Sequence, residues 1–465
     1  MFGLLLLLYL AALLWLGIRA GRRVHDEEDY LVAGRRLSLP LVSATLMATW
    51  FGAATLLGAA EAARVEGLRG TLLDPFASGV ALVVAGLLFA RRLWDMRLLT
   101  IGDFFARRFG PRAELAATVV LVPGGLGWIA AQYVALGSLL QATFGVPLVL
   151  GIVISAAVVM TLALVGGMWS VTLTDAAQLV VVLATLVILA WVSAAQLGDG
   201  SVLAGVDHLL ERIPAEDLSL APEVGLVAHV AWVSTCASGV LGGLPTQELV
   251  QRMFAARSAR TAAWGCVLAG VAYIGFGLIP VGLGLASRLL QPTAQGDILS
   301  VLAQAFLSPA LSLVFLLGVV SIVVSTATSA VLAPASLLGH NLWSRLPWGR
   351  RHRLAASRWS VVVVSLGGVV VALGGGTILS LLEASLSIVL VTLVVPLFGG
   401  VFGAPQGDAS ARLSMLAGGV TWGALALLEP GGPWSPVLLG LGASALGYGL
   451  GHAWDRRATP RPTSA

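Results

Sequence analysis

The segment Ala48-Thr49-Trp50-Phe51-Gly52-Ala53-Ala54 interrupts an apolar run that covers residues 39–63. A helix of about 20 apolar residues is long enough to cross the hydrocarbon core of a bilayer, which is roughly 30 Å thick. The stretch from Trp50 to Ala54 lies midway along this run and is weak helix, because glycine and aromatic residues have lower helix propensity than alanine or leucine. The sequence therefore predicts a membrane helix that is broken at its centre.

A second interruption lies in the seventh apolar run, where Ser238-Gly239 and Gly242-Gly243-Leu244-Pro245 are also weak helix. We expect the second run to point outward and the seventh to point inward. Residues 39–195 would then form a first repeat of five helices, and residues 224–401 a second repeat of opposite orientation. Inverted repeats with broken helices at their centre are typical of secondary transporters.

The whole chain is apolar enough to be a membrane protein. Of its 465 residues, 58% are hydrophobic and 11% are charged, which excludes an ordinary soluble protein. We expect an all-α polytopic membrane protein with about thirteen transmembrane helices. The thirteen apolar runs are 2–18, 39–63, 70–90, 115–144, 146–165, 171–195, 224–243, 261–286, 310–338, 359–373, 378–401, 413–428 and 437–452.

The basic residues predict the orientation of these helices. All 27 are arginines, and only Arg64, Arg69, Arg212 and Arg288 fall on one side, which leaves 27 − 4 = 23 on the other. Because arginine-rich loops stay in the cytoplasm, the N-terminus is predicted outside and the C-terminus inside. The basic balance is thus explained by topology and anionic lipid, and no nucleic-acid partner is expected.

A single membrane domain is expected over residues 1–465. It would contain an extra N-terminal helix in 1–20, an outside loop in 196–223 and extra C-terminal helices in 411–453. Within the outside loop, apolar residues from Val202 to Ile213 recur at helical spacing, which predicts a short amphipathic helix on the membrane surface.

Adjacent hydroxyls suggest a cation site in the ninth run. Ser325 and Thr326 lie about 15 residues from its outer end, which is roughly mid-bilayer at 1.5 Å per residue. Hydroxyl and carbonyl oxygens suit a hard monovalent ion that has lost its hydration shell. The alternative is that these hydroxyls bond the carbonyl four residues earlier in their own helix or a neighbouring helix.

Ionisable residues at membrane depth are the other candidates, because they are costly there and rarely without a role. The sequence places Glu61, Asp74, Asp175 and Glu383 at such depth, with no arginine among them. Asp175 lies about one turn inside the cytoplasmic end of the sixth run, where it either receives an ion that leaves inward or caps its helix. The roles of Glu61 and Glu383 remain open.

Four stretches resemble the sodium:solute symporter family. They are Asp29 to Arg36, Ala48 to Ala53, Gly166-Gly167 to Asp175, and Pro245 followed by Gln251-Arg252, and their order and spacing also match. The resemblance covers essentially the whole chain and includes the thirteen-span arrangement of bacterial members. It implies a LeuT-type core of two inverted repeats and a place in the bacterial inner membrane.

The resemblance also implies site residues. A sodium ion would lie between the second and ninth runs, held by the hydroxyls of Ser325 and Thr326 and the carbonyls of Ala48, Phe51 and Ile322. Asp175 would serve sodium coupling or release. The solute would lie beside the first helix break, near Trp50, Gly52, Thr55, Asp74, Gln132 and Trp232. Proline symporters of the family have an aspartate where this chain has Trp50, so a different pocket is expected.

The predicted function is sodium-coupled symport of a small organic solute, such as a carboxylate, an amino acid or a sugar. Proton coupling through Asp175 or Asp74 is the alternative within transport, and a membrane sensory module without transport is the alternative outside it. No nucleophile, metal cluster or phosphate loop occurs in the required context, so no enzyme activity is expected. We expect sodium as the coupling ion, no organic cofactor, the lipid bilayer as surroundings and no obligate protein partner.

Overall fold

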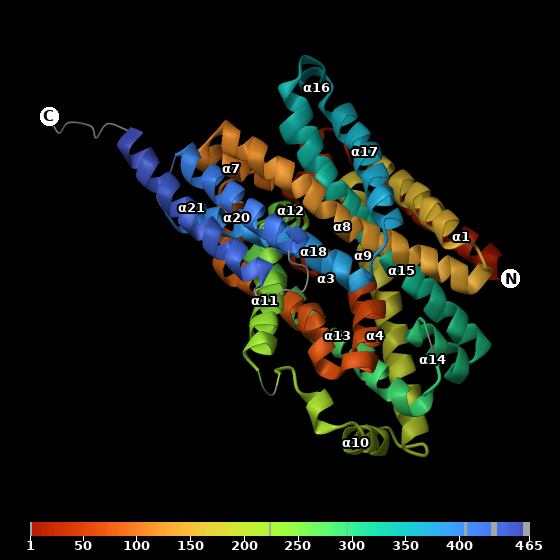
Figure 1. Cartoon of the computed structure of the whole chain (residues 1–465). Coiled ribbons are helices and arrows are strands. Elements are labelled where there is room, and N and C mark those ends of the chain that lie inside the picture. The colour runs from red at the N-terminus through yellow and green to blue at the C-terminus, as the bar shows by residue number, and fades with distance from the viewer. Residues whose placement is uncertain (1, 223–224, 295, 404–406, 429–434, 459–465) are drawn as a thin grey trace.

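The computed structural model describes residues 2–222, 225–294, 296–403, 407–428 and 435–458. Within these ranges the chain is helical apart from turns, loops and one isolated bridge between Leu37 and Ala256. Figure 1 shows the long helices packed into one bundle, with α10 (Val202–Arg212) across one end and α16 (Pro347–Arg351) at the opposite end. The predicted boundary between residues 223 and 224 lies outside the described residues.

The first half of the chain contains nine α-helices, three of which are long. They are α1 (Phe2–Gly21), α2 (Glu27–Val32), α3 (Leu39–Trp50), α4 (Ala59–Glu66), α5 (Ser78–Val84), α6 (Ala90–Asp95), α7 (Ile101–Phe109), α8 (Pro111–Phe144) and α9 (Leu148–Leu197). Short 3-10 or π segments connect some of them: η1 (Ala33–Arg35), η2 (Ala54–Gly58), η3 (Gly67–Thr71), η4 (Leu72–Ala77) and η5 (Ala85–Phe89).

Helix α9 is broken at Gly167, between the fifth and sixth predicted runs. Gly167 has φ 52° and ψ −154°, a conformation that residues with a side chain rarely adopt. A Cβ atom there would also lie 2.5 Å from the ring of Tyr30. Glycine at this position therefore lets two membrane spans follow each other directly.

The second half begins with α10 and η6 (Ala215–Leu218) and continues with helices of varied length. These are α11 (Leu226–Gly242), α12 (Gln247–Ala255), α13 (Ala259–Leu290), α14 (Ile298–Phe306), α15 (Pro309–Leu337), α16, α17 (Arg353–Leu373), α18 (Ile378–Val389), α19 (Val395–Phe402), α20 (Asp408–Leu428) and α21 (Pro436–Ala458), with η7 (Leu338–Leu342), η8 (Trp343–Arg345) and η9 (Leu390–Val394) between them. The hydroxyls of Ser258, Ser308 and Thr377 cap the N-termini of α13, α15 and α18.

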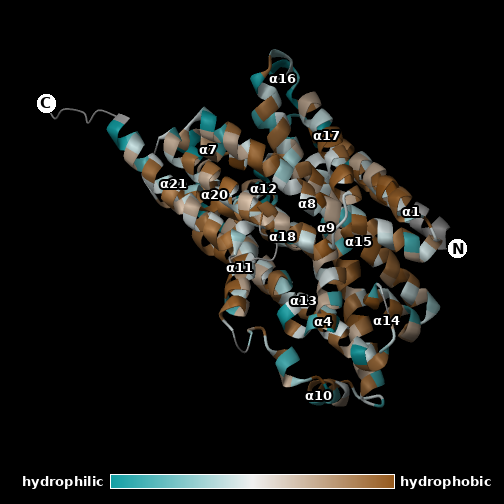
Figure 2. Ribbon diagram, viewed as in Figure 1, coloured by the Kyte–Doolittle hydropathy of each residue, from teal (hydrophilic) through white to brown (hydrophobic). Residues whose placement is uncertain are grey.

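The thirteen predicted apolar runs are mostly helical in the part of the chain that the structure describes, apart from the first break at Phe51 and Gly52 and a few residues at the ends of runs. Among the described residues, ten stretches are long and apolar enough to cross a membrane, and one of these, Ala54–Asp95, joins parts of the second and third runs. Large apolar side chains such as Leu427 (82% exposed) and Val370 (71%) cover the outer surface, and Figure 2 shows this hydrophobic surface along the bundle. Such a surface fits lipid as the surrounding solvent. The orientation with the N-terminus outside stays a prediction.

Both predicted helix breaks are confirmed. Helix α3 ends at Trp50, and helical structure resumes at Ala53. Helix α11 ends at Gly242, and α12 starts at Gln247. The two breaks touch, because a Cβ atom on Gly243 would lie 2.6 Å from the ring of Trp50. The predicted amphipathic helix of the outside loop is confirmed as α10.

Candidate ion and solute sites

The first break leaves one backbone carbonyl, that of Ala48, without its helical hydrogen bond. The N–H of Gly52 donates to Trp50 O at 2.8 Å, so Ala48 O loses the donor that a continuous helix would supply. Thr326 Oγ1 of α15 donates to Ala48 O at 3.0 Å instead. A Cβ atom on residue 52 would lie 2.7 Å from Thr326 Cγ2, so glycine is needed for this close approach. The break and α15 therefore meet through Thr326.

Asp175 lies beside the same hydroxyls. Its carboxylate accepts hydrogen bonds from Ser325 Oγ and, at 2.6 Å, from Thr45 Oγ1. Asp175 and Thr326 are fully buried, and Ser325 is 4% exposed. The structure thus brings Ala48, Ser325, Thr326 and Asp175 together as a cluster of oxygens inside the bundle, which is the ligand type that a hard cation prefers.

Two other predicted ligands are less defined. Phe51 and Ile322 are fully buried on the first break and on α15, respectively. Whether their carbonyls face the same point stays a prediction. Asp175 was predicted to serve sodium coupling or release, and its carboxylate accepts a hydrogen bond from the hydroxyl of Ser325.

Side chains of two other helices form hydrogen bonds with two further backbone groups of the first break. Trp50 O accepts the Tyr273 hydroxyl of α13 at 3.0 Å, and Ala53 N donates to Gln132 Oε1 of α8 at 3.2 Å. Buried backbone groups are costly when unpaired. The break is therefore held by side chains from α8, α13 and α15.

Asp74 is the centre of a second buried network. It is 3% exposed, and its Oδ1 accepts Thr55 Oγ1 at 2.8 Å. The Tyr273 hydroxyl lies 2.9 Å from each carboxylate oxygen. Because that hydroxyl has one proton, it donates to either Asp74 or Trp50 O at a given time. The network links the first break to the third predicted run.

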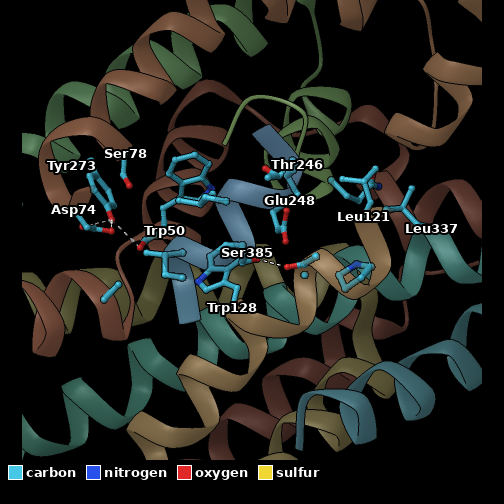
Figure 3. A pocket seen from close by; sticks show the side chains of 18 residues that line it. Trp50, Asp74, Ser78, Leu121, Trp128, Thr246, Glu248, Tyr273, Leu337 and Ser385 are labelled. Atoms are coloured by element: carbon cyan, nitrogen blue, oxygen red, sulfur yellow. Dashed lines mark hydrogen bonds between the residues drawn. The ribbon is translucent and has the colours of Figure 1, made fainter. Parts of the chain in front are cut away.

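A cavity lies beside both helix breaks (Figure 3). Its empty volume is about 650 Å³, which includes space open to solvent. Trp50, Trp128 and Tyr273 give it aromatic walls, and Asp74 and Glu248 give it carboxyl groups. Among the described residues that line it, none is an arginine.

The predicted solute residues lie in different places. Trp50 and Asp74 line the cavity. Gly52, Thr55 and Gln132 lie behind its wall, where they contact Thr326, Asp74 and the backbone of the break. Trp232 lies apart, and its ring N–H donates to Leu220 O at 2.9 Å. The solute roles of all six residues stay predictions.

Two charged residues that were not among the expected candidates are also buried. Glu248 and Arg252 of α12 are 4% and 0% exposed. All nine residues of α12 are buried, because the second break turns this helix back into the bundle. Tyr273, Trp128 and Thr45 were also missed. The stretch from Pro245 to Arg252 was the signal that could have located α12.

A helix bundle with two facing broken helices and a cavity between them defines a LeuT-fold secondary transporter. The chain is similar in structure to a Na+-coupled sialic acid symporter, with a TM-score of 0.78, 15% identity and 99% and 98% of the two chains covered. It is also similar to Mhp1, a nucleobase-cation-symport-1 family transporter, with a TM-score of 0.63, 16% identity and 93% and 95% covered. The LeuT-type fold predicted from sequence is confirmed.

The family follows from sequence comparison. The model of the sodium:solute symporter family matches residues 30–405, and the chain belongs to this family. Members of this family are transporters and not enzymes, and the resemblance noted in the sequence is confirmed.

Curated relatives include high-affinity choline transporters. The chain is 28% identical over 364 residues to high-affinity choline transporter 1 of Caenorhabditis elegans, which covers 71% of this chain and 61% of the relative. It is 27% identical over 359 residues to the human high affinity choline transporter 1, covering 74% and 60%. An uncharacterized symporter of Cupriavidus necator is 30% identical over 212 residues, covering 42% and 31%. The chain thus spans about three fifths of the choline transporters that it matches.

Proposed function

We propose that this protein is a sodium-coupled symporter of a small organic cation, located in a bacterial inner membrane. The observation that carries the proposal is the cavity between the two breaks, with its aromatic walls and its two carboxyl groups. The oxygen cluster around Ser325 and Thr326 supports sodium as the coupling ion.

The cavity favours a cation over the carboxylate, neutral amino acid or sugar that the sequence left open. Aromatic faces attract a quaternary ammonium group by about 0.5–2 kcal/mol per ring, and more when the site is dry. Asp74 and Glu248 add negative charge, and the lining offers no arginine to pair with a carboxylate. The choline transporters among the relatives are consistent with this class of solute.

The mechanism we propose is alternating access. Sodium enters between Ala48 and the hydroxyls of α15, where it fixes the geometry of the first break. Trp50 belongs to that break and also lines the cavity, so sodium binding prepares one wall of the solute site. Ion and solute affinities are then coupled, and the coupling is reciprocal.

The test is uptake into proteoliposomes under an inward sodium or potassium gradient at fixed voltage and pH. Radiolabelled choline, glycine betaine, proline and glucose would be compared. We expect sodium-dependent uptake of choline above the other solutes. Uptake that follows a proton gradient and ignores sodium would favour the proton-coupled alternative.

Tryptophan variants test the aromatic walls. Trp128→Ala should weaken choline affinity by roughly 5- to 30-fold, the equivalent of about 1–2 kcal/mol, and Trp128→Phe should weaken it less. Trp359→Ala is a matched control, because this ring is 60% exposed on the outer surface. Equal choline affinity in Trp128→Ala and Trp359→Ala would contradict an aromatic cation site.

A further inference from the structure

Arg252 is a buried charged residue that has no role in the transport cycle proposed above. It is fully buried and is among the largest fully buried side chains of the described residues. Its Nη1 donates to Glu248 O at 2.9 Å, but Nε and Nη2 have no hydrogen-bond partner. None of the ion pairs formed by the described residues includes it. A guanidinium group left with free N–H donors inside a protein is costly, so a second position for it is expected.

Two carboxylates interact with the charge of Arg252, one at the proposed ion site and the other at the solute cavity. Asp175, which bonds Ser325, and Glu248, which lines the cavity, both interact electrostatically with Arg252. The position follows from the fold, because α12 comes directly after the second break and packs against α3 and α15. The packing of α12 therefore places Arg252 in the part of the bundle next to the helices that carry Ala48 and Ser325.

We propose that Arg252 is the internal counter-ion of Asp175 in the empty transporter. This inference rests on the proposed sodium symport. With sodium bound, the carboxylate of Asp175 is balanced by the ion. After sodium leaves, Asp175 keeps only the neutral hydroxyls of Ser325 and Thr45. A buried carboxylate without a counter-ion is strongly unfavourable. The free Nε and Nη2 groups of Arg252 then turn to Asp175 and keep the interior neutral while the empty protein returns outward.

This role makes Arg252 a competitor of sodium for Asp175. Removing its charge should tighten sodium binding, because the empty site loses its substitute cation. It should also slow the return of the empty transporter, which net uptake requires. Exchange of internal for external solute does not require that step, since the loaded protein moves in both directions. Arg252 is thus a positioning residue. Removing its charge should strengthen sodium binding and slow net uptake.

The experiment compares Arg252→Gln, Arg252→Lys and the wild-type protein. Sodium affinity would be measured as thermal stabilisation by NaCl alone at constant ionic strength. Net uptake and exchange of choline would be measured in proteoliposomes. For Arg252→Gln we expect about 5- to 20-fold tighter sodium binding, which lies within the usual range of coupling between sites. Net uptake should fall roughly tenfold while exchange stays within about twofold. Arg252→Lys should resemble the wild type in all three.

Several results would overturn the inference. Weaker or unchanged sodium binding in Arg252→Gln would do so, and so would an equal loss of net uptake and exchange. Arg288→Gln is the control, because this arginine pairs with Asp217 at 2.6 Å away from both sites and should change neither quantity. If the wild type itself shows no sodium-specific stabilisation, the proposed function fails and this inference fails with it.

A second variant keeps the test decisive if Arg252→Gln does not fold. In the double variant Asp175→Asn/Arg252→Gln both charges are absent, so residue 175 no longer carries a buried carboxylate that lacks its counter-ion. We expect this double variant to be purified in higher yield and to unfold at a higher temperature than Arg252→Gln in sodium-free buffer. A double variant that is no more stable than Arg252→Gln would show that Arg252 does not balance Asp175.

Discussion

The two helix breaks differ in what holds them. At the first break, Ala48 O and Trp50 O accept hydrogen bonds from side chains of α15 and α13, and Ala53 N donates to α8. At the second break the bonds are local. Leu244 N donates to Leu241 O at 3.1 Å, and the Thr246 hydroxyl donates to Gly243 O at 2.8 Å.

This difference indicates which of the two breaks changes shape when an ion or a solute binds. The first break takes its shape from three other helices, so an ion or a solute that moves any of these partners also moves the break. The second break is a turn closed by its own residues, and its shape is largely independent of the ion. We therefore expect the first break to transmit binding and the second to act as a fixed bend that positions α12.

The largest expected difference is between Gly52→Ala and Gly243→Ala, which add the same methyl group to the two breaks. The new Cβ at residue 52 would meet the short side chain of Thr326 at 2.7 Å, whereas that at residue 243 would meet the far end of the Trp50 ring at 2.6 Å. Overpacking costs about 1–3 kcal/mol. Gly52→Ala should thus weaken sodium binding by about 5- to 150-fold.

Gly243→Ala should leave sodium affinity close to that of the wild type, because the end of the Trp50 ring can shift. It should alter solute affinity, since this ring lines the cavity. The sodium affinities of Gly52→Ala and Gly243→Ala are compared by measuring the unfolding temperature of each variant at increasing sodium concentration. Equal losses of sodium affinity in the two variants would contradict the contrast between the breaks.

A smaller effect is expected for Tyr273→Phe, which removes one partner of the first break. Trp50 O keeps the N–H of Gly52, and Asp74 keeps the Thr55 hydroxyl. The loss should be near the lower end of the cost of an unsatisfied buried acceptor, about 1 kcal/mol of stability. Thermal unfolding in sodium-free buffer measures it. No change in stability would mean that Tyr273 does not support the break.

The smallest effect is expected for Thr246→Val at the second break. It removes one local hydrogen bond, which contributes about 0.5–1.5 kcal/mol to stability. Sodium affinity should stay unchanged, because no residue of the ion cluster bonds Thr246. A loss of sodium affinity in Thr246→Val would indicate that the second break also senses the ion.

Much of the fold could be predicted because it depends on local signals. Apolar runs identified the helices, and the glycines at residues 52 and 243 located the two breaks. The depth of Ser325 and Thr326 along their run, together with the family resemblance, pointed to the place where Thr326 meets Ala48. These features are carried by single segments, so composition and spacing are enough to find them.

The cavity walls were harder to predict because they come from packing between helices. Trp128 and Tyr273 lie on long apolar helices, where a tryptophan or tyrosine is more often a packing residue than a ligand-binding one. Arg252 was counted among the 23 arginines of the cytoplasmic side and Glu248 was not singled out, because nothing local reveals that α12 is buried. Trp232 was implied as a solute residue by the family resemblance, and its ring N–H donates to Leu220 O of the outside loop.

The proposed sodium site is tested most directly by a sodium titration of thermal stability in detergent, with wild type and Ser325→Ala/Thr326→Ala compared at constant ionic strength against potassium. We expect a sodium-specific rise in the unfolding temperature of the wild type, and its loss in the double variant without loss of expression. An unchanged sodium response in the double variant would contradict the assignment of the ion to α15 and the first break.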